Sequence, residues 1–362
     1  MNATGDAAIG RIFAQVLRPV AVGGFLALLA LPGVAQTSYP AREIPARTLP
    51  VPGDVSLQMQ KMIAVAPRAD WEAFPQTAEE WKTLATTGAT GAIQALPALR
   101  ARLHVKVEAT TIDGVRAYIV TPEEIPKENR NRLLVHVHGG CYVLSPGEAG
   151  TAEAILMAGF GHFKVISVDY RMPPEAYFPA ALDDAMTVWK AALKMADPKK
   201  MAIFGTSAGG ALTLEMILQA KKAGLPLPAA IAPGTPMSDV TKTGDSFQTN
   251  ALVDNVLIST AGLCDAAAKF YANGHDLKDP LLSPVYGDFA GFPPAILTTG
   301  TRDLLLSNTV RVHRKLRQAG VEASLQVYEG QSHAQYSRDD TAPETQEAFG
   351  EIAAFFDRHL GK

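Results

Sequence analysis

The sequence predicts an α/β protein with a doubly wound, mostly parallel sheet, an antiparallel N-terminal edge and a helical cap. From residue 133 onward, short apolar runs alternate with helix-length segments, and such runs are typical of strands buried on both faces. A hairpin signal precedes this alternation, and two stretches with helical periodicity precede the hairpin. The alternation indicates parallel strands joined by right-handed crossovers, and the hairpin indicates the antiparallel edge.

The region before the sheet divides into a linker and two helices. Residues 36–55 are rich in proline, which is typical of an extended segment. Helices are predicted over 57–65 and 77–103, and Thr77 and Glu80 have the spacing of a capping box at the start of the second helix. Residues 36–103 are therefore predicted to be a linker followed by two helices.

The sheet region covers residues 104–362. Its hairpin pairs two strands around Ile112-Asp113-Gly114. Segment 240–273 interrupts the later alternation, and its length indicates a lid that contributes to the cap. The predicted strands after the hairpin are 133–137, 164–168, 201–204, 229–232, 295–299 and 323–328, and the predicted helices between them are 180–196, 208–223 and 307–319.

Composition narrows the classes of partner. The chain has 362 residues, 47% of them hydrophobic and 19% charged, which is enough apolar material for a globular core. Its 33 Lys and Arg against 36 Asp and Glu give a net charge of −3, with no basic stripe. This balance argues against a nucleic-acid partner and favours a small-molecule substrate. A homodimer is left open.

Residues 1–35 have the pattern of a secretory signal peptide. Arg11 and Arg18 precede an apolar run, and Gly33-Val34-Ala35 places small residues before a cleavage site. The run is about 12 residues long, too short for a bilayer core that needs about 20. We expect a secreted or periplasmic protein with no integral membrane span in the mature chain; the alternative is an uncleaved N-terminal anchor.

The strongest motif for chemistry is Gly205-Thr206-Ser207-Ala208-Gly209. It stands directly after a predicted strand and directly before a predicted helix. In this context Ser207 lies on a sharp turn, with the positive end of the helix beside its hydroxyl. The motif therefore predicts a nucleophilic serine.

A second motif, His138-Gly139-Gly140-Cys141-Tyr142, follows the strand at 133–137. The glycine pair exposes backbone N–H groups that neither a helix nor a strand claims, so the turn can bind negative charge. We interpret His138 as a brace for this turn rather than a base. His136 and His138 could face one metal ion, but the spacing indicates no third ligand, so we expect no metal and no organic cofactor.

Three motifs in order make the sequence similar to the hormone-sensitive lipase group of bacterial esterases, within the α/β-hydrolase superfamily. His138–Tyr142 resembles the group's HGGG-aromatic motif, Asp169–Glu175 its DYRLAPE motif, and Gly205–Gly210 its GTSAGG motif. The resemblance covers the chain from about residue 104 to the C-terminus. It implies an α/β-hydrolase catalytic domain over 104–362. Residues 57–103 fall where the group has a helical cap, so the resemblance makes residues 36–103 a linker and an N-terminal helical cap.

The partners of Ser207 are expected in the order acid, then histidine. Asp303 follows the strand at 295–299, and His333 follows the strand at 323–328, so both lie where loops reach the carboxyl edge of the sheet. Asp303 matches the group's acid and His333 its general base. Ala334-Gln335 departs from the usual Gly-Phe after the histidine.

The resemblance also implies an oxyanion hole. Its donors would be the backbone N–H groups of Gly140, Cys141 and Ala208, with Gly139 shaping the turn. Cys141 stands where the group has its third glycine. Because it lies in this turn, we expect no disulfide with Cys264, the second of two cysteines.

Aromatic and aliphatic residues of the cap could contact the substrate. We predict this role for Tyr142, Trp81, Phe247 and Leu252, although aromatic residues at helical spacing are more often part of a core.

The predicted activity is hydrolysis of small esters with short- to medium-length acyl chains through an acyl-enzyme. Alternatives are a lactone or amide hydrolase with the same residues, and a non-catalytic small-molecule receptor on the same fold, such as the gibberellin receptors, which lack the catalytic histidine. The presence of Ser207, Asp303 and His333 favours the enzyme.

Expression with a working secretion system tests the signal peptide. We expect the mature chain to begin at Gln36, because Ala35 ends the cleavage pattern. Intact-mass measurement of the exported protein decides the matter, and a chain that still carries Met1 would indicate an anchor.

Overall fold

A computed structural model describes residues 41–361; the predicted signal peptide lies outside the described residues. The chain divides into two units, residues 1–49 and residues 50–362. Residues 41–49 contain no helix or strand. The helices and strands named below all belong to the second unit.

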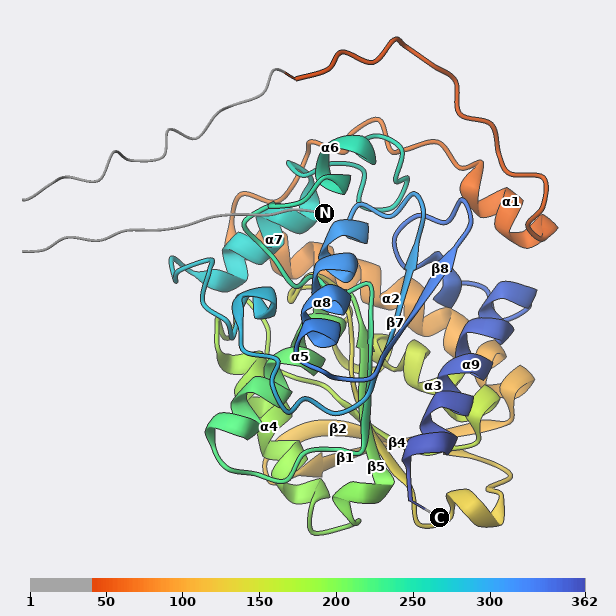
Figure 1. The fold of residues 1–362 in the computed structure, drawn as a ribbon, viewed down its shortest axis with the longest axis vertical. Helices are drawn as coiled ribbons and strands as arrows, with labels where there is room; N and C mark the ends of the chain where they lie inside the picture. The colour runs from red at the N-terminus through yellow and green to blue at the C-terminus, as the bar shows by residue number, and fades with distance from the viewer. Residues whose placement is uncertain (1–40, 362) are drawn as a thin grey trace, which may run out of the picture. The chain divides into compact units, whose positions relative to one another are not determined.

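Within the described residues the strands form one eight-stranded sheet with the order β1-β2-β4-β3-β5-β6-β7-β8 (Figure 1). β2 pairs antiparallel with both β1 and β4, and the other neighbouring pairs are parallel. The predicted mostly parallel sheet with an antiparallel N-terminal edge is confirmed. The strands are β1 (Val105–Ile112), β2 (Val115–Pro122), β3 (Leu133–Val137), β4 (Lys164–Val168), β5 (Met201–Thr206), β6 (Ala230–Gly234), β7 (Ala295–Gly300) and β8 (Ala323–Tyr328).

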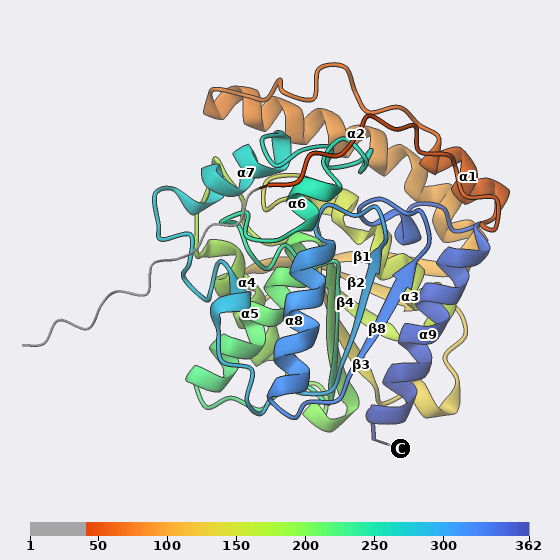
Figure 2. The same ribbon diagram turned by 45° about the horizontal axis from the view of Figure 1, so that its top comes forward.

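Helices cover both faces of the sheet. α4 (Ala180–Ala192), α5 (Ala208–Lys222) and α8 (Leu306–Gln318) lie on one face, and α3 (Ala152–Gly161) and α9 (Pro343–His359) lie on the other (Figure 2). Neither α3 nor α9 was predicted from the sequence. None of the helices between residues 41 and 361 combines the length and apolar composition needed to cross a bilayer.

The remaining helices gather at one end of the sheet (Figure 2). They are α1 (Leu57–Ile63), α2 (Ala78–Leu103), α6 (Ser246–Thr249) and α7 (Leu263–Ala272). The capping box at the start of α2 is present: Thr77 Oγ1 accepts from the Glu80 N–H, and the Glu80 carboxylate accepts from the Thr77 N–H. Trp81 of α2 stacks on Phe270 of α7 with ring centroids 5.5 Å apart.

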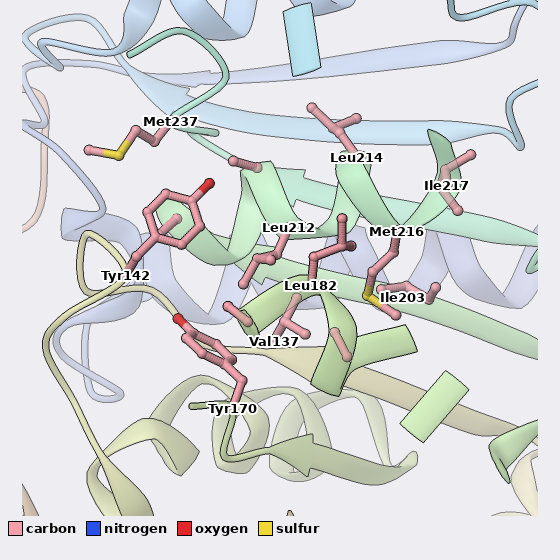
Figure 3. Packing of buried hydrophobic residues seen from close by; sticks show 14 of the residues in the cluster. Val137, Tyr142, Tyr170, Leu182, Ile203, Leu212, Leu214, Met216, Ile217 and Met237 are labelled. Carbon is pink, nitrogen blue, oxygen red and sulfur yellow. The ribbon is translucent and has the colours of Figure 1, made fainter. Parts of the chain in front are cut away.

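Two glycines allow β3, β5 and α5 to meet. A Cβ atom on Gly205 would lie 2.1 Å from the Val137 carbonyl oxygen, and one on Gly209 would lie 2.0 Å from the same oxygen. This oxygen belongs to the backbone and cannot turn away. The buried side chains beside this junction include Val137, Leu212 and Ile203 (Figure 3). The glycines of the motif are therefore required by packing between the strands and the helix.

Gly209→Ala tests this close approach. We expect a loss of about 3 kcal/mol or more in the free energy of unfolding, because the added methyl group overlaps backbone. The measurement is urea denaturation. Gly350→Ala is the matched control, since Gly350 is exposed in α9 and nothing lies within 4 Å of the point where its methyl group would stand. This variant should gain roughly 0.5–1 kcal/mol; equal effects of the two changes would contradict the packing argument.

Candidate active site

Ser207 stands on a strained turn between β5 and α5. Its backbone angles are φ 64° and ψ −121°, a region that costs energy for a residue with a Cβ atom. The turn is fixed because the Ser207 N–H donates to the Gly234 carbonyl at 2.9 Å and the Met237 N–H donates to the Ser207 carbonyl at 3.0 Å. Ser207 lines a cavity of about 410 Å³.

Asp303 and His333 meet at the carboxyl ends of β7 and β8. His333 Nδ1 lies 3.1 Å from Asp303 Oδ1, and both side chains are buried. The other carboxylate oxygen of Asp303 accepts from Thr235 at 2.5 Å and from Thr299 at 3.2 Å. His333 lines the same cavity as Ser207. Its Nε2 is buried and has no hydrogen-bond partner among residues 41–361.

The turn after β3 has an unusual backbone. Gly140, Cys141 and Tyr142 follow one another with φ values of 114°, 54° and 65°. A Cβ atom on Gly139 would lie 2.6 Å from the Thr206 carbonyl oxygen, and one on Gly140 would lie 2.4 Å from the Leu144 carbonyl oxygen. Glycine at these two positions therefore lets the turn pack against the residue before Ser207 and close on itself.

The amide groups of this turn are available to a ligand. Within the described part of the chain, the N–H groups of Gly140, Cys141 and Ala208 have no hydrogen-bond acceptor. Gly139, Gly140 and Cys141 line the cavity beside Ser207, and Ala208 is the first residue of α5. Free amide donors and the positive end of a helix favour negative charge at this point.

The expectation that Cys141 and Cys264 stay unpaired is wrong. They form a disulfide with their Cα atoms 5.4 Å apart. The segment that carries α7 folds back over the turn after β3, and this places Cys264 beside Cys141. Both residues line the cavity.

The histidines of β3 and its turn have structural contacts. His138 Nδ1 lies 2.7 Å from the Gly139 carbonyl oxygen, and the ring stacks on Tyr170 with centroids 4.1 Å apart. Burial lowers the pKa of His138 to about 4, so the ring is neutral at pH 7 and braces the turn. His136 contacts Ser167 and Glu153. No cluster of three or more His, Cys, Asp or Glu side chains among residues 41–361 is arranged to hold a metal ion.

A polar network behind Ser207 was not predicted. Thr206 Oγ1 lies 2.6 Å from a carboxylate oxygen of Glu153 and 2.7 Å from the Tyr336 hydroxyl. Thr206 precedes Ser207, and Tyr336 lies in the loop of His333. The network therefore joins the loop of Ser207 to the loop of His333.

Asp254 is a second residue that sequence reasoning missed. One of its carboxylate oxygens accepts from the Leu304 N–H at 2.8 Å and from the His333 N–H at 3.3 Å. The other accepts from the N–H groups of Val256 and Leu257. Burial raises the pKa of this carboxyl. Asp254 thus joins the segment between β6 and β7 to the loops that carry Asp303 and His333.

The four residues predicted to contact the substrate do not line the cavity around Ser207. Tyr142 is fully buried below the turn, Trp81 is buried against Phe270, Phe247 lines a smaller neighbouring cavity, and Leu252 is 60% exposed. The apolar wall of the cavity around Ser207 consists mainly of Leu144, Val256, Leu257 and Leu263. Two of these follow Asp254 closely, so they are placed by a contact that spacing along the chain does not show.

The fold and the site define a class of protein. A serine on a strand–turn–helix elbow, a histidine bound to a buried carboxylate and free amide groups beside the serine are the parts of a serine hydrolase on an α/β sheet. A family profile described as the alpha/beta hydrolase fold matches residues 134–337. The chain belongs to this superfamily and, within it, to the carboxylesterases related to hormone-sensitive lipase.

Relatives agree with this assignment. An esterase of Acinetobacter venetianus is 30% identical over 258 residues, which cover 70% of this chain and 84% of the relative. An acetyl-hydrolase of Streptomyces hygroscopicus is 28% identical over 238 residues, which cover 66% and 79%. The crystal structure of esterase E25 matches with a TM-score of 0.86 and 45% identity, covering 89% of this chain and 99% of that chain. The protein is a serine carboxylesterase, as the sequence predicted.

A double-mutant cycle tests the network behind Ser207. Thr206→Val and Tyr336→Phe each remove one end of a buried hydrogen bond, so we expect their destabilisation to be non-additive by about 0.5–3 kcal/mol. Urea denaturation of both single variants and the double variant gives this coupling. Thr86→Val combined with Tyr336→Phe is the control, because the Thr86 hydroxyl bonds only within α2. Additivity in the first pair would show that the contact contributes nothing.

Proposed function

We propose that Ser207, His333 and Asp303 are the catalytic triad of this carboxylesterase. Ser207 Oγ attacks the carbonyl carbon of the ester and gives its proton to His333 Nε2. The tetrahedral intermediate collapses, the C–O bond to the alcohol breaks, and the alcohol leaves with that proton. Water then attacks the acyl-enzyme by the same route and restores the Ser207 hydroxyl.

One observation carries this proposal. His333 has its Nδ1 engaged by a fully buried carboxylate and its Nε2 without a partner among the described residues, in the cavity that Ser207 lines. The contact to Asp303 keeps the ring proton on Nδ1, so Nε2 is the unprotonated, basic nitrogen. The carboxylate also stabilises the imidazolium when His333 holds the second proton.

The backbone N–H groups of Gly140, Cys141 and Ala208 would form the oxyanion hole. Among the described residues they are donors without acceptors beside Ser207, and such donors act most strongly where charge develops in the transition state. Gly139 has a different task, because it lets the turn approach the elbow.

The size and lining of the cavity support a substrate class of small esters with short- to medium-length acyl chains. Its volume is about 410 Å³ and its wall is apolar at Leu144, Val256, Leu257 and Leu263, which suits an alkyl chain of limited length. The relative named acetyl-hydrolase agrees with a short acyl group. A lactone presents the same carbonyl to Ser207, whereas an amide asks more of His333 as an acid because its leaving group is poorer.

We also propose that the protein is exported. The N-terminal pattern supports a signal peptide, and a Cys141–Cys264 disulfide suits an oxidising compartment.

Ser207→Ala tests the nucleophile. We expect kcat for p-nitrophenyl butyrate to fall by at least about 10⁴-fold with the fold retained, because the change removes the hydroxyl that forms the acyl-enzyme. Far-ultraviolet circular dichroism checks the fold, and Ser324→Ala on β8 is the control serine. A Ser207→Ala variant with a tenth of the wild-type rate would end the assignment. A series of p-nitrophenyl esters from acetate to laurate, with a lactone and an anilide beside it, gives the substrate class; the highest kcat/KM on laurate or on the anilide would contradict the proposal.

A further inference from the structure

We propose that Cys264 is a positioning residue for catalysis: through its disulfide, helix α7 holds the Cys141 amide where the oxyanion forms. This inference rests on the proposed oxyanion hole. The Cys141 N–H is the group that donates to the oxyanion, and Cys264 acts only through Cys141.

The turn after β3 has a costly backbone conformation and two hydrogen bonds of its own. Three successive residues, Gly140 to Tyr142, have positive φ, and two of them carry a Cβ atom that makes the conformation costly. The Gly140 carbonyl accepts from the N–H groups of Val143 and Leu144. The N–H groups at the ligand side have no acceptor among the described residues. A strained turn of this kind persists only when its surroundings fix it.

Helix α7 contacts the turn at two consecutive residues. Cys264 binds Cys141 covalently, and Tyr271 stacks on Tyr142 with centroids 4.5 Å apart and planes 5° apart. Cys264 and Tyr271 are two helical turns apart and so lie on the same face of α7. One face of the helix therefore holds both residues of the turn.

The other side of Tyr142 is also fixed. Its hydroxyl donates to a carboxyl oxygen of Glu215 in α5 at 2.8 Å. Burial raises the pKa of Glu215 well above its usual value. Tyr142 is thus held between α7 and α5 inside the buried cluster that also contains Leu212 and Met237 (Figure 3).

Helix α7 is itself attached to the rest of the protein. The Phe178 N–H, just before α4, donates to the Tyr271 carbonyl at 2.9 Å. Trp81 of α2 stacks on Phe270. Because the helix is anchored on both sides, the disulfide can transmit its position to the Cys141 amide.

The alternative is that the disulfide only stabilises the fold and has no effect on catalysis; we call such a cross-link a staple. It joins residues 123 positions apart, and such a cross-link stabilises a fold by constraining the unfolded chain. A staple would change the melting temperature and leave kcat unchanged. A positioning residue would change kcat and the affinity for an oxyanion analogue, with little change in KM.

The experiment compares the exported protein with its Cys264→Ser variant and with Ala266→Ser, a half-buried control position on the same helix. Four quantities are measured with p-nitrophenyl butyrate: kcat, KM, the melting temperature, and inhibition by an alkyl trifluoromethyl ketone, which forms an oxyanion on the serine. A butyl aryl ether, which cannot form an oxyanion, serves as the ground-state analogue.

We expect Cys264→Ser to lower kcat by about 10- to 100-fold, less than the 10²–10³-fold typical of a donor removed outright. The affinity for the trifluoromethyl ketone should fall by a similar factor, while KM and the affinity for the ether stay within about twofold. Unchanged kcat with a lower melting temperature would overturn the proposal in favour of a staple. A raised KM with unchanged kcat would overturn it in favour of a role in shaping the cavity.

If Cys264→Ser does not fold, reduction of the folded wild-type protein makes the same comparison. Activity should fall in step with the appearance of two thiols, counted by mass spectrometry after alkylation, while the near-ultraviolet circular dichroism is retained. Full activity with both thiols alkylated would overturn the proposal. The failure of the proposed function is separate, since it appears as residual activity of Ser207→Ala with the disulfide intact.

Discussion

The site depends on one close approach of backbone, between the end of β3 and the elbow that joins β5 to α5. The Val137 carbonyl faces Gly205 and Gly209 at distances that exclude a Cβ atom at either position. This approach puts the turn after β3 beside Ser207, so the turn and the Ser207 side chain line one cavity. Glycine is required here by contact between segments that are far apart in the sequence.

Local signals were sufficient for much of the fold. Strands β3, β5, β6 and β7 are short runs in which every residue is buried, and Thr77 with Glu80 marks the start of α2. Helix α3 was missed because its residues 154–158 are all buried, so it has no polar face to give it a helical period. Ser207, Asp303 and His333 could be placed because each follows a strand, and the carboxyl ends of parallel strands meet at one edge.

Several of the contacts that sequence reasoning missed involve the segment between β6 and β7. Cys264 of this segment pairs with Cys141, Asp254 accepts from the His333 N–H, and Leu257 lines the cavity of Ser207. Neither the periodicity of the sequence nor the spacing of its motifs predicts such contacts. The predicted substrate contact Leu252 also belongs to this segment. It is exposed to solvent, whereas Val256 and Leu257 form part of the wall of the cavity around Ser207.

The proposed reaction requires that Ser207 is a nucleophile activated by His333. Its most direct measurement is peptide mapping of the protein after reaction with diethyl p-nitrophenyl phosphate, which phosphorylates activated serines. We expect one diethylphosphoryl group per chain, on the peptide that contains Ser207, and at least about 10³-fold slower labelling of His333→Ala, because the proton of Ser207 then has no acceptor. Labelling on another residue, or labelling of His333→Ala at the wild-type rate, would contradict the account.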